Sequence, residues 1–321
     1  MQTKFNFDFI GHRKKFFIFS IVLMAVCILS TFVLGAKLDI QFKGGTILTY
    51  VYDGDINVDE FVSEAKNILG GAEMTYTTGT DFTTGRNNIQ LSLMSNEGIN
   101  SDKQFELTNT LAAKYAAHNI ELIESSDVSP SSGKEFFAKC LVAVACSSVV
   151  LIIYIAVRFK NIGGWLAGVC AILTLLHDCV VVYGVFIIGG MSINANFMAV
   201  VLTILGYSIN DTIVIYDRIR ENEKLYRKTK TRSEIVNLST NQSLTRSINT
   251  SLTTFFSMLA VTIVAAIYGV DSIMSFSLPM LFGMVSGAYS SLFIAAPLWA
   301  YLEDIRDKKK NEKAVHKKKR A

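Results

Sequence analysis

Long apolar runs recur along the chain, and they constrain its fold more than any other feature. A helix needs about 20 predominantly apolar residues to cross a bilayer. Six stretches meet that length: 16–36, 136–157, 162–188, 195–216, 244–268 and 273–302. Half of the 321 residues are hydrophobic and only 18% are charged, a composition that ordinary soluble domains do not have. We therefore predict a polytopic α-helical membrane protein with six transmembrane helices.

Basic residues mark the ends of these runs that are expected to face the cytoplasm. Residues 1–15, the segment 217–241 and the tail 303–321 are rich in Lys and Arg, and loops with an excess of these residues stay inside. The first run is longer than the roughly 7–15 apolar residues of a signal peptide, so we expect it to be retained as a helix. The pattern predicts a multi-pass membrane protein with both termini in the cytoplasm.

The basic tail is interpreted first as a topology anchor. Attraction to anionic membrane lipid, or to ribosomal RNA, is the alternative. The net charge of +4 arises from this uneven distribution, so we do not take it as a sign of nucleic-acid binding.

The polar stretch 37–133 between the first two runs is the candidate for a folded domain outside the membrane. It holds 14 acidic and 6 basic residues, and the net charge of −8 fits the non-cytoplasmic side. Periodicity predicts strand, helix, strand, strand, helix and strand at 46–52, 58–69, 73–80, 88–93, 102–117 and 120–126. Asn57 and Ser101 are the expected helix N-caps. This order is the ferredoxin-like α+β pattern, and we expect the domain to dock and not to catalyse.

One ionisable residue, Asp211, lies inside the fourth apolar run. A charged group there costs about 2.5–3.5 kcal/mol on insertion scales, so such residues usually mark ion or proton pathways. At helical spacing Asp211 shares a face with Tyr207 and Ser208, while Asn210 and Thr212 flank it. We predict an ion-coupling or proton-coupling site at this position. The alternative is that Asp211 only joins two helices through a hydrogen bond.

Arg246 stands near the cytoplasmic start of the fifth run, at a depth compatible with that of Asp211. A polar stripe continues from it at helical spacing, through Asn249, Thr250, Thr253 and Ser257. Because an unpaired charge at that depth is disfavoured, we predict that the two charged residues act as a pair. The alternative is that Arg246 extends to the headgroups as an anchor. The predicted site therefore consists of Asp211, Arg246, Asn210, Ser208 and Thr212.

A second pair of ionisable residues, His177 and Asp178, lies near the middle of the third run. Adjacent helical positions point about 100° apart, so we expect these two side chains not to share a face. Either is a candidate relay residue, and a buried packing role is the alternative for His177.

An intramembrane hydrolase is the enzymatic alternative, because His177, Asp178 and Ser286 all lie in apolar runs. The chain lacks G-x-S-x-G, H-E-x-x-H and G-x-x-x-x-G-K. Its five cysteines lie in apolar runs without metal-ligand spacing. We expect no enzymatic activity, no cofactor and no metal, so the energy has to come from an ion gradient or a partner.

The stretch Gly206–Asn222, which reads G-Y-S-I-N-D-T-I-V-I-Y-D-R-I-R-E-N, resembles the SecF family of protein-export membrane subunits. Three further stretches are similar to that family: F-D-F-I-G-H-R-K-K from Phe7, F-K-G-G-T from Phe42, and L-T-R-S-I-N-T-S-L-T-T from Leu244. The resemblance covers nearly the whole chain. One position departs from it, since Gln41 stands where the family usually has Asp.

The resemblance implies a subunit of the resistance-nodulation-division superfamily with a ferredoxin-like extracytoplasmic domain between helices 1 and 2. It implies that a SecD-like membrane subunit is the partner, and that the pair uses the proton or sodium gradient to drive late translocation of unfolded preproteins through the SecYEG translocon. YidC and YajC are further candidate partners. The family's functional Asp and Arg fall on Asp211 and Arg246.

Small residues at four-residue spacing also indicate close helix packing and a membrane partner. They are Gly164 with Gly168 and Gly283 with Gly287. Two other functions stay open at this point: an ion-driven lipid or drug exporter of the same superfamily, and a scaffold of the translocon that transports nothing.

Overall fold

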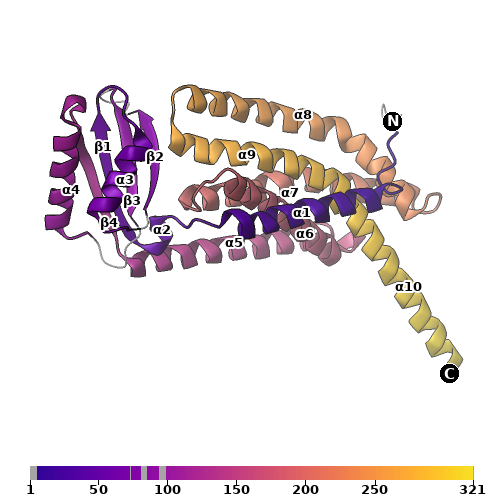
Figure 1. Ribbon diagram of the computed structural model, residues 1–321. Coiled ribbons are helices and arrows are strands. Elements are labelled where there is room, and N and C mark those ends of the chain that lie inside the picture. The colour runs from indigo at the N-terminus through magenta and orange to yellow at the C-terminus, as the bar shows by residue number, and fades with distance from the viewer. Residues whose placement is uncertain (1–5, 73, 81–84, 94–98, 321) are drawn as a thin grey trace.

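The computed structural model describes residues 6–72, 74–80, 85–93 and 99–320, which form a long helical bundle with a small sheet domain at one end (Figure 1). The bundle helices are α1 (Arg13–Leu34), α5 (Pro130–Arg158), α6 (Gly164–Ile188), α7 (Ala195–Tyr226), α8 (Arg232–Ile267) and α9 (Asp271–Ser290). A π-helical turn (Ser291–Ala295) joins α9 to α10 (Ala296–Arg320), which projects from the bundle and carries the C-terminus. Within the described residues six helices are long and apolar enough to cross a membrane, which confirms the predicted class.

The helices α7 and α8 extend well beyond the apolar residues that predicted them. α7 continues to Tyr226 and α8 already begins at Arg232, so only a short turn joins them. A capping box starts α8: the Thr231 hydroxyl accepts the Glu234 N–H at 3.3 Å, and the Glu234 carboxylate accepts the Thr231 N–H at 2.7 Å. The polar segment 217–241 is therefore mostly helical.

The sheet domain lies in sequence between α1 and α5. Its elements are α2 (Ile40–Lys43), β1 (Gly45–Tyr52), α3 (Val58–Ile68), β2 (Met74–Thr80), β3 (Asn87–Leu93), α4 (Ser101–Lys114) and β4 (Glu121–Val128). The strands pair antiparallel in the order β2-β3-β1-β4. Apolar residues of β1 and β3 pack with those of α3 and α4 in one core, including Leu48, Phe61, Leu91 and Leu107. This order is the ferredoxin-like arrangement that the sequence predicts.

One of the two predicted helix caps is correct and the other is wrong. Asn57 caps α3, since its Oδ1 accepts the Glu60 N–H at 3.3 Å. Asn100, and not Ser101, caps α4, since its side chain accepts the Asp102 N–H at 3.4 Å. Asn and Ser are about equally good caps, so sequence preference alone could not choose between neighbouring positions.

Glycines let the bundle helices approach closely, as their spacing predicts. A Cβ on Gly168 of α6 would lie 3.2 Å from the carbonyl of Ile152 on α5. A Cβ on Gly283 of α9 would lie within 2.9 Å of side chains on both α6 and α7, and one on Gly287 would lie 3.0 Å from the Ser208 Cβ. These contacts hold α6, α7 and α9 together as the centre of the bundle.

Hydrogen bonds near the start of α7 help to attach the sheet domain to the bundle. The linker after α1 is held against the loop before α7, where the Asp39 N–H donates to the Ile193 carbonyl at 3.0 Å and Leu38 forms a bridge with Ile193. The Gln41 side chain accepts the Ala195 N–H at 3.0 Å, at the first residue of α7. The amide at the position where the family usually has Asp therefore serves as an acceptor at a helix N-terminus.

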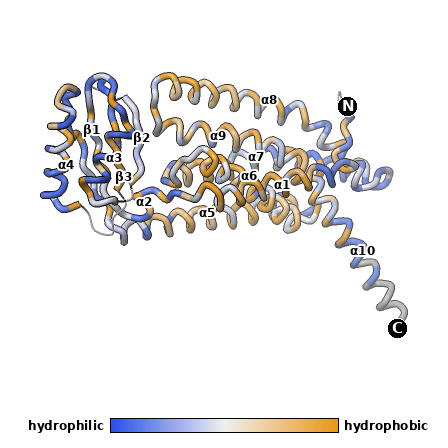
Figure 2. Tube along the Cα trace, in the orientation of Figure 1, coloured by the Kyte–Doolittle hydropathy of each residue, from blue (hydrophilic) through white to orange (hydrophobic). Residues whose placement is uncertain are grey.

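Hydropathy separates the molecule into an apolar bundle and more polar ends (Figure 2). α6 and α7 are the most buried of the spans before α9, whereas α1, α5 and α8 leave most of their apolar side chains exposed in this chain. Exposed apolar helix faces are what contact with lipid or with another membrane chain requires.

Candidate ion-coupling site

Asp211 lies on α7 at its contact with α8. Its side chain is 4% exposed, and the Ser251 hydroxyl of α8 donates to its Oδ2 at 3.2 Å. One turn earlier on α7, the Tyr207 hydroxyl lies 3.0 Å from the Thr254 hydroxyl of α8. The two helices are therefore joined by polar contacts on the face that carries the carboxylate.

Arg246 stands on α8 and is exposed in this chain. No ion pair between Arg246 and Asp211 is found in the described part of the chain. The guanidinium group is therefore not locked to the carboxylate in this conformation.

The predicted polar stripe on α8 points away from the rest of the chain. Asn249, Thr253 and Ser257 are exposed, and Thr250 is half-buried. The hydroxyls donate to carbonyls of their own helix, as in Ser257 to Thr253 at 3.0 Å and Thr253 to Asn249 at 2.6 Å. This satisfies the hydroxyl donors locally, but leaves Arg246 and Asn249 on an outward face.

The remaining predicted residues do not surround Asp211. Asn210 is exposed and points about 100° away from Asp211 on α7. Ser208 and Thr212 are buried, yet they turn toward other helices: the Ser208 hydroxyl donates to Asp178 of α6 at 2.7 Å, and the Thr212 hydroxyl lies 2.9 Å from that of Ser291. Ser208 and Asp211 are three residues apart and both buried, but Ser208 contacts α6 whereas Asp211 contacts α8.

Asp178 is the centre of a second buried polar cluster. Its side chain is 0% exposed, and three hydroxyls donate to it at 2.6–2.8 Å; they belong to Ser208, Ser286 and Ser290. Nδ1 of His177 lies 3.1 Å from the Asp178 carboxylate. The expectation that these neighbours cannot share a face was wrong, because the side chains are long enough to close a 100° separation.

Sequence reasoning singled out Ser208 and Ser286 but missed the other serines of these clusters. Ser251 lies off the stripe that Arg246 begins. Ser290 ends α9 and Ser291 begins the π-helical turn, which no periodicity predicts. Ser286 and Ser290 share a helix face at four-residue spacing beside Gly287, and this spacing was the available signal. None of the described hydroxyls is hydrogen-bonded to His177, so the cluster lacks the nucleophile–base contact of a hydrolase.

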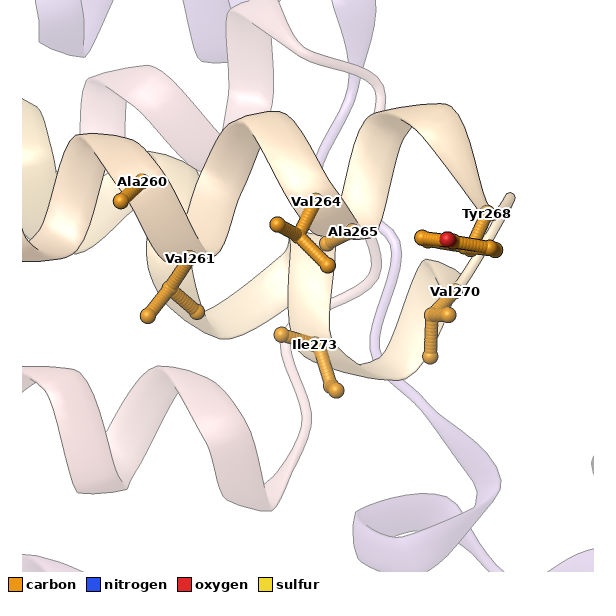
Figure 3. A pocket seen from close by; sticks show the side chains of 7 residues that line it. All are labelled: Ala260, Val261, Val264, Ala265, Tyr268, Val270 and Ile273. Atoms are coloured by element: carbon orange, nitrogen blue, oxygen red, sulfur yellow. The ribbon is translucent and has the colours of Figure 1, made fainter.

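A pocket at the α8–α9 turn has an apolar lining, unlike the polar clusters around Asp211 and Asp178 (Figure 3). It lies at the end of the hairpin nearest the sheet domain and is lined by Ala260, Val261, Val264, Ala265, Tyr268, Val270 and Ile273. Apolar walls of this kind suit lipid tails and offer nothing to hold an ion.

A bundle of six membrane-spanning helices with a ferredoxin-like domain inserted after the first helix defines a class of polytopic membrane protein. The family model described as "Protein export membrane protein SecD/SecF, C-terminal" matches residues 108–304. The chain is 34% identical over 316 residues to the protein translocase subunit SecF of Petrotoga mobilis, covering 96% of this chain and 99% of that one. It is 32% identical over 300 residues to SecF of Rickettsia bellii, covering 93% and 94%.

Solved structures give the same assignment. The crystal structure of SecDF from Thermus thermophilus matches with a TM-score of 0.77 at 28% identity over 94% of this chain. SecDF in its super-membrane-facing form matches with a TM-score of 0.69 at 29% identity over 98%. The chain spans 39% and 41% of the length of those two proteins. It belongs to the SecD/SecF family of protein-export membrane proteins.

Proposed function

We propose that this chain is a SecF-like subunit that acts with a SecD-like membrane subunit in Sec-dependent export. The pair would use the proton or sodium gradient to drive late movement of unfolded preproteins through SecYEG, with YidC and YajC as accessory partners. The proposal places both termini in the cytoplasm of a bacterial cell and needs neither a cofactor nor an enzymatic step.

The observation that carries this proposal is the outward polar stripe on α8. Arg246 and Asn249 lie on an exposed face of a helix that crosses the membrane. A charged side chain facing lipid costs about 2.5–3.5 kcal/mol on insertion scales. A second membrane chain against α8 removes that cost, because it can supply polar partners. The related SecDF proteins support the same arrangement, since this chain matches about two fifths of each.

The coupling step follows from the geometry around Asp211. Among the described residues, the Asp211 carboxylate accepts one hydrogen bond, from Ser251, and forms no ion pair with Arg246. Asp211 is therefore free to alternate between a protonated form and an ionised form paired with Arg246. One charge crossing 100 mV yields about 2.3 kcal/mol, so several ions would be needed for one large movement of the sheet domain.

Cross-linking from the stripe tests the partner assignment. A photo-crosslinking amino acid in place of Thr253 should form an adduct with a SecD-like subunit in native membranes. The matched control is the same substitution at Val150 of α5, which is exposed on a different, apolar face. Adducts from position 253 to lipid alone, with the translocon intact, would contradict the proposal. Adducts to an unrelated exporter subunit would favour the exporter alternative.

A further inference from the structure

The Asp178 carboxylate is more fully hydrogen-bonded than any functional group considered above. Its Oδ1 accepts from Ser286 at 2.6 Å and contacts His177 at 3.1 Å. Its Oδ2 accepts from Ser208 at 2.7 Å and Ser290 at 2.8 Å. The donors come from α6, α7 and α9, so three helices converge on one carboxylate.

Four donors match the number that an ionised carboxylate can accept. Its two oxygens offer about four lone-pair sites, and a protonated carboxyl group would have to give one of them up. The number and placement of these partners therefore suit an ionised carboxylate at Asp178. A bare cation such as Na⁺ would have to displace donors from this shell, whereas a proton on a neighbouring group would not.

His177 is the neighbouring group that can hold that proton. If Asp178 is ionised and only accepts, His177 Nδ1 carries the hydrogen between them. Nε2 on the other side of the ring is buried and has no partner among the described residues, and the residue is 2% exposed. Nε2 is therefore able to change between a lone pair and an N–H without breaking any hydrogen bond of the cluster.

The effect of protonating His177 Nε2 depends on the titratable and charged groups around the His177–Asp178 pair. The titratable neighbours are Tyr289 of α9, with ring centroids 6.2 Å apart, Cys179 beside Asp178, and Cys27 of α1, which packs on Gly184. Toward the cytoplasmic end, Glu303 of α10 interacts electrostatically with Cys170, two turns before His177. Arg158 of α5 forms an ion pair with Asp217 of α7. α7 contributes Asp211, one turn beyond Ser208.

We infer that His177 and Asp178 form a second proton-binding site, in which Asp178 is the fixed counter-ion and His177 Nε2 takes up and releases the proton. With a neutral imidazole the pair carries a net charge of about −1 inside the bundle, and with an imidazolium its net charge is about zero. A buried charge in the membrane is costly unless paired, so proton uptake changes the electrostatics of the bundle centre.

Ser208 connects this site to Asp211. It donates to Asp178 from α7, and its carbonyl accepts the Ser291 hydroxyl at 3.1 Å beside the π-helical turn. Asp211 follows three residues later, on the face toward α8. A proton at either site therefore acts on the same turn of α7. This coupling rests on the proposed function, whereas proton binding at His177 does not.

Nitrogen-15 NMR of the full chain in lipid vesicles tests the site directly. Substituting the other three histidines, His12→Gln, His118→Gln and His316→Gln, leaves His177 as the one labelled ring. Between pH 9 and pH 5, His177 should change from a neutral ring protonated at Nδ1 to an imidazolium. A difference spectrum between wild type and His177→Gln gives the same reading if the triple variant does not fold.

Two matched variants separate the site from its surroundings. Ser286→Ala removes one hydroxyl donor and should keep the two-state titration. Asp178→Asn removes the counter-ion, and His177 should then stay neutral at the acid pH where the wild type is an imidazolium. A single protonation state over the whole range, or a neutral ring protonated at Nε2, would overturn the inference. Neither result would bear on Asp211, whose role is measured by export.

Discussion

At the scale of single residues, the two buried carboxylates differ in how many partners hold them. Asp178 accepts from three hydroxyls and contacts His177. In the part of the chain that the structure describes, Asp211 accepts a hydrogen bond only from Ser251, at 3.2 Å. A group with few fixed partners can change partner at low cost, while a saturated group resists any change in its own charge. Asp211 is therefore suited to change its hydrogen-bond partner during coupling, whereas Asp178 is suited to keep the same partners throughout.

Asp53 of the sheet domain gives a pH prediction. The Asn119 amide donates to its carboxylate at 2.9 Å and Arg86 donates at 2.7 Å, and these partners hold the pKa of Asp53 below its usual range. The resulting stability is present above the unfolded pKa of about 3.9 and is lost as the pH falls through the lower folded pKa. Asp53→Asn should reduce hydrogen-exchange protection of β1 at pH 7, and its difference from wild type should vanish in acid.

The control for Asp53 is Asp55→Asn, a change at an exposed neighbour that should leave protection of β1 at its wild-type level. Equal protection of wild type and Asp53→Asn at pH 7 would show that these hydrogen bonds contribute nothing.

The sequence could identify the ionisable residues but not rank them. Asp211 and Asp178 stand out because any charge in an apolar run is unusual. Their hydroxyl partners come from α7, α8 and α9, distant in the chain, and serines in apolar helices are too common to single out. Asn210 illustrates the same limit: its neighbour Asp211 is buried, yet Asn210 itself is exposed.

At the scale of elements, close approach of helices decides which side chains meet. α9 lies so near α7 that a Cβ on Gly287 would come 3.0 Å from the Ser208 Cβ. The same approach brings Ser286 and Ser290 onto Asp178. The apolar runs and glycine spacing predicted the helices and their packing. The length of α7 and α8 was not predictable in this way, because their polar turns continue past the apolar residues.

Gly287→Ala tests this approach. The new methyl group forces α9 away from α7, and overpacking of this kind costs about 1–3 kcal/mol. We expect the unfolding midpoint of the purified chain in a denaturing-detergent titration to fall. Gly206→Ala on α7 is the matched control, since a Cβ there meets nothing within 4 Å; it should be neutral or stabilise by up to about 1 kcal/mol. A control that destabilises as much as Gly287→Ala would contradict the packing argument.

At the scale of the whole molecule, the chain is a bundle in which one exposed helix face, on α8, carries polar side chains. α6, α7 and α9 form a buried centre, but α8 presents a polar stripe outward. Contacts at Ile193 and Ala195 attach the sheet domain beside the start of α7, the helix that also carries Asp211. A rearrangement of α7 against α8 can therefore move the sheet domain, because the start of α7 contacts that domain directly.

Topology is the first prediction at this scale. Reporter fusions at Asp55 and at Ala321, a position outside the described residues, should report opposite sides of the membrane, with the sheet domain outside the cytoplasm. Lys and Arg are enriched beside the span ends that we predict to be cytoplasmic, and the positive-inside rule therefore predicts this arrangement. Fusions that report the same side would exclude six spans with a cytoplasmic C-terminus.

The central claim is that Asp211 and Arg246 couple an ion gradient to export, and export rates in energised membranes test it most directly. Asp211→Asn, Arg246→Met and the double variant should all export at the rate that wild type shows when the gradient is collapsed. Residues acting as one unit are not additive, so the double variant should be no worse than either single one. Asp217→Asn, on the same helix and ion-paired with Arg158 and Arg220, should keep gradient-dependent export. Asp211→Asn exporting at the wild-type rate under a full gradient would contradict the claim.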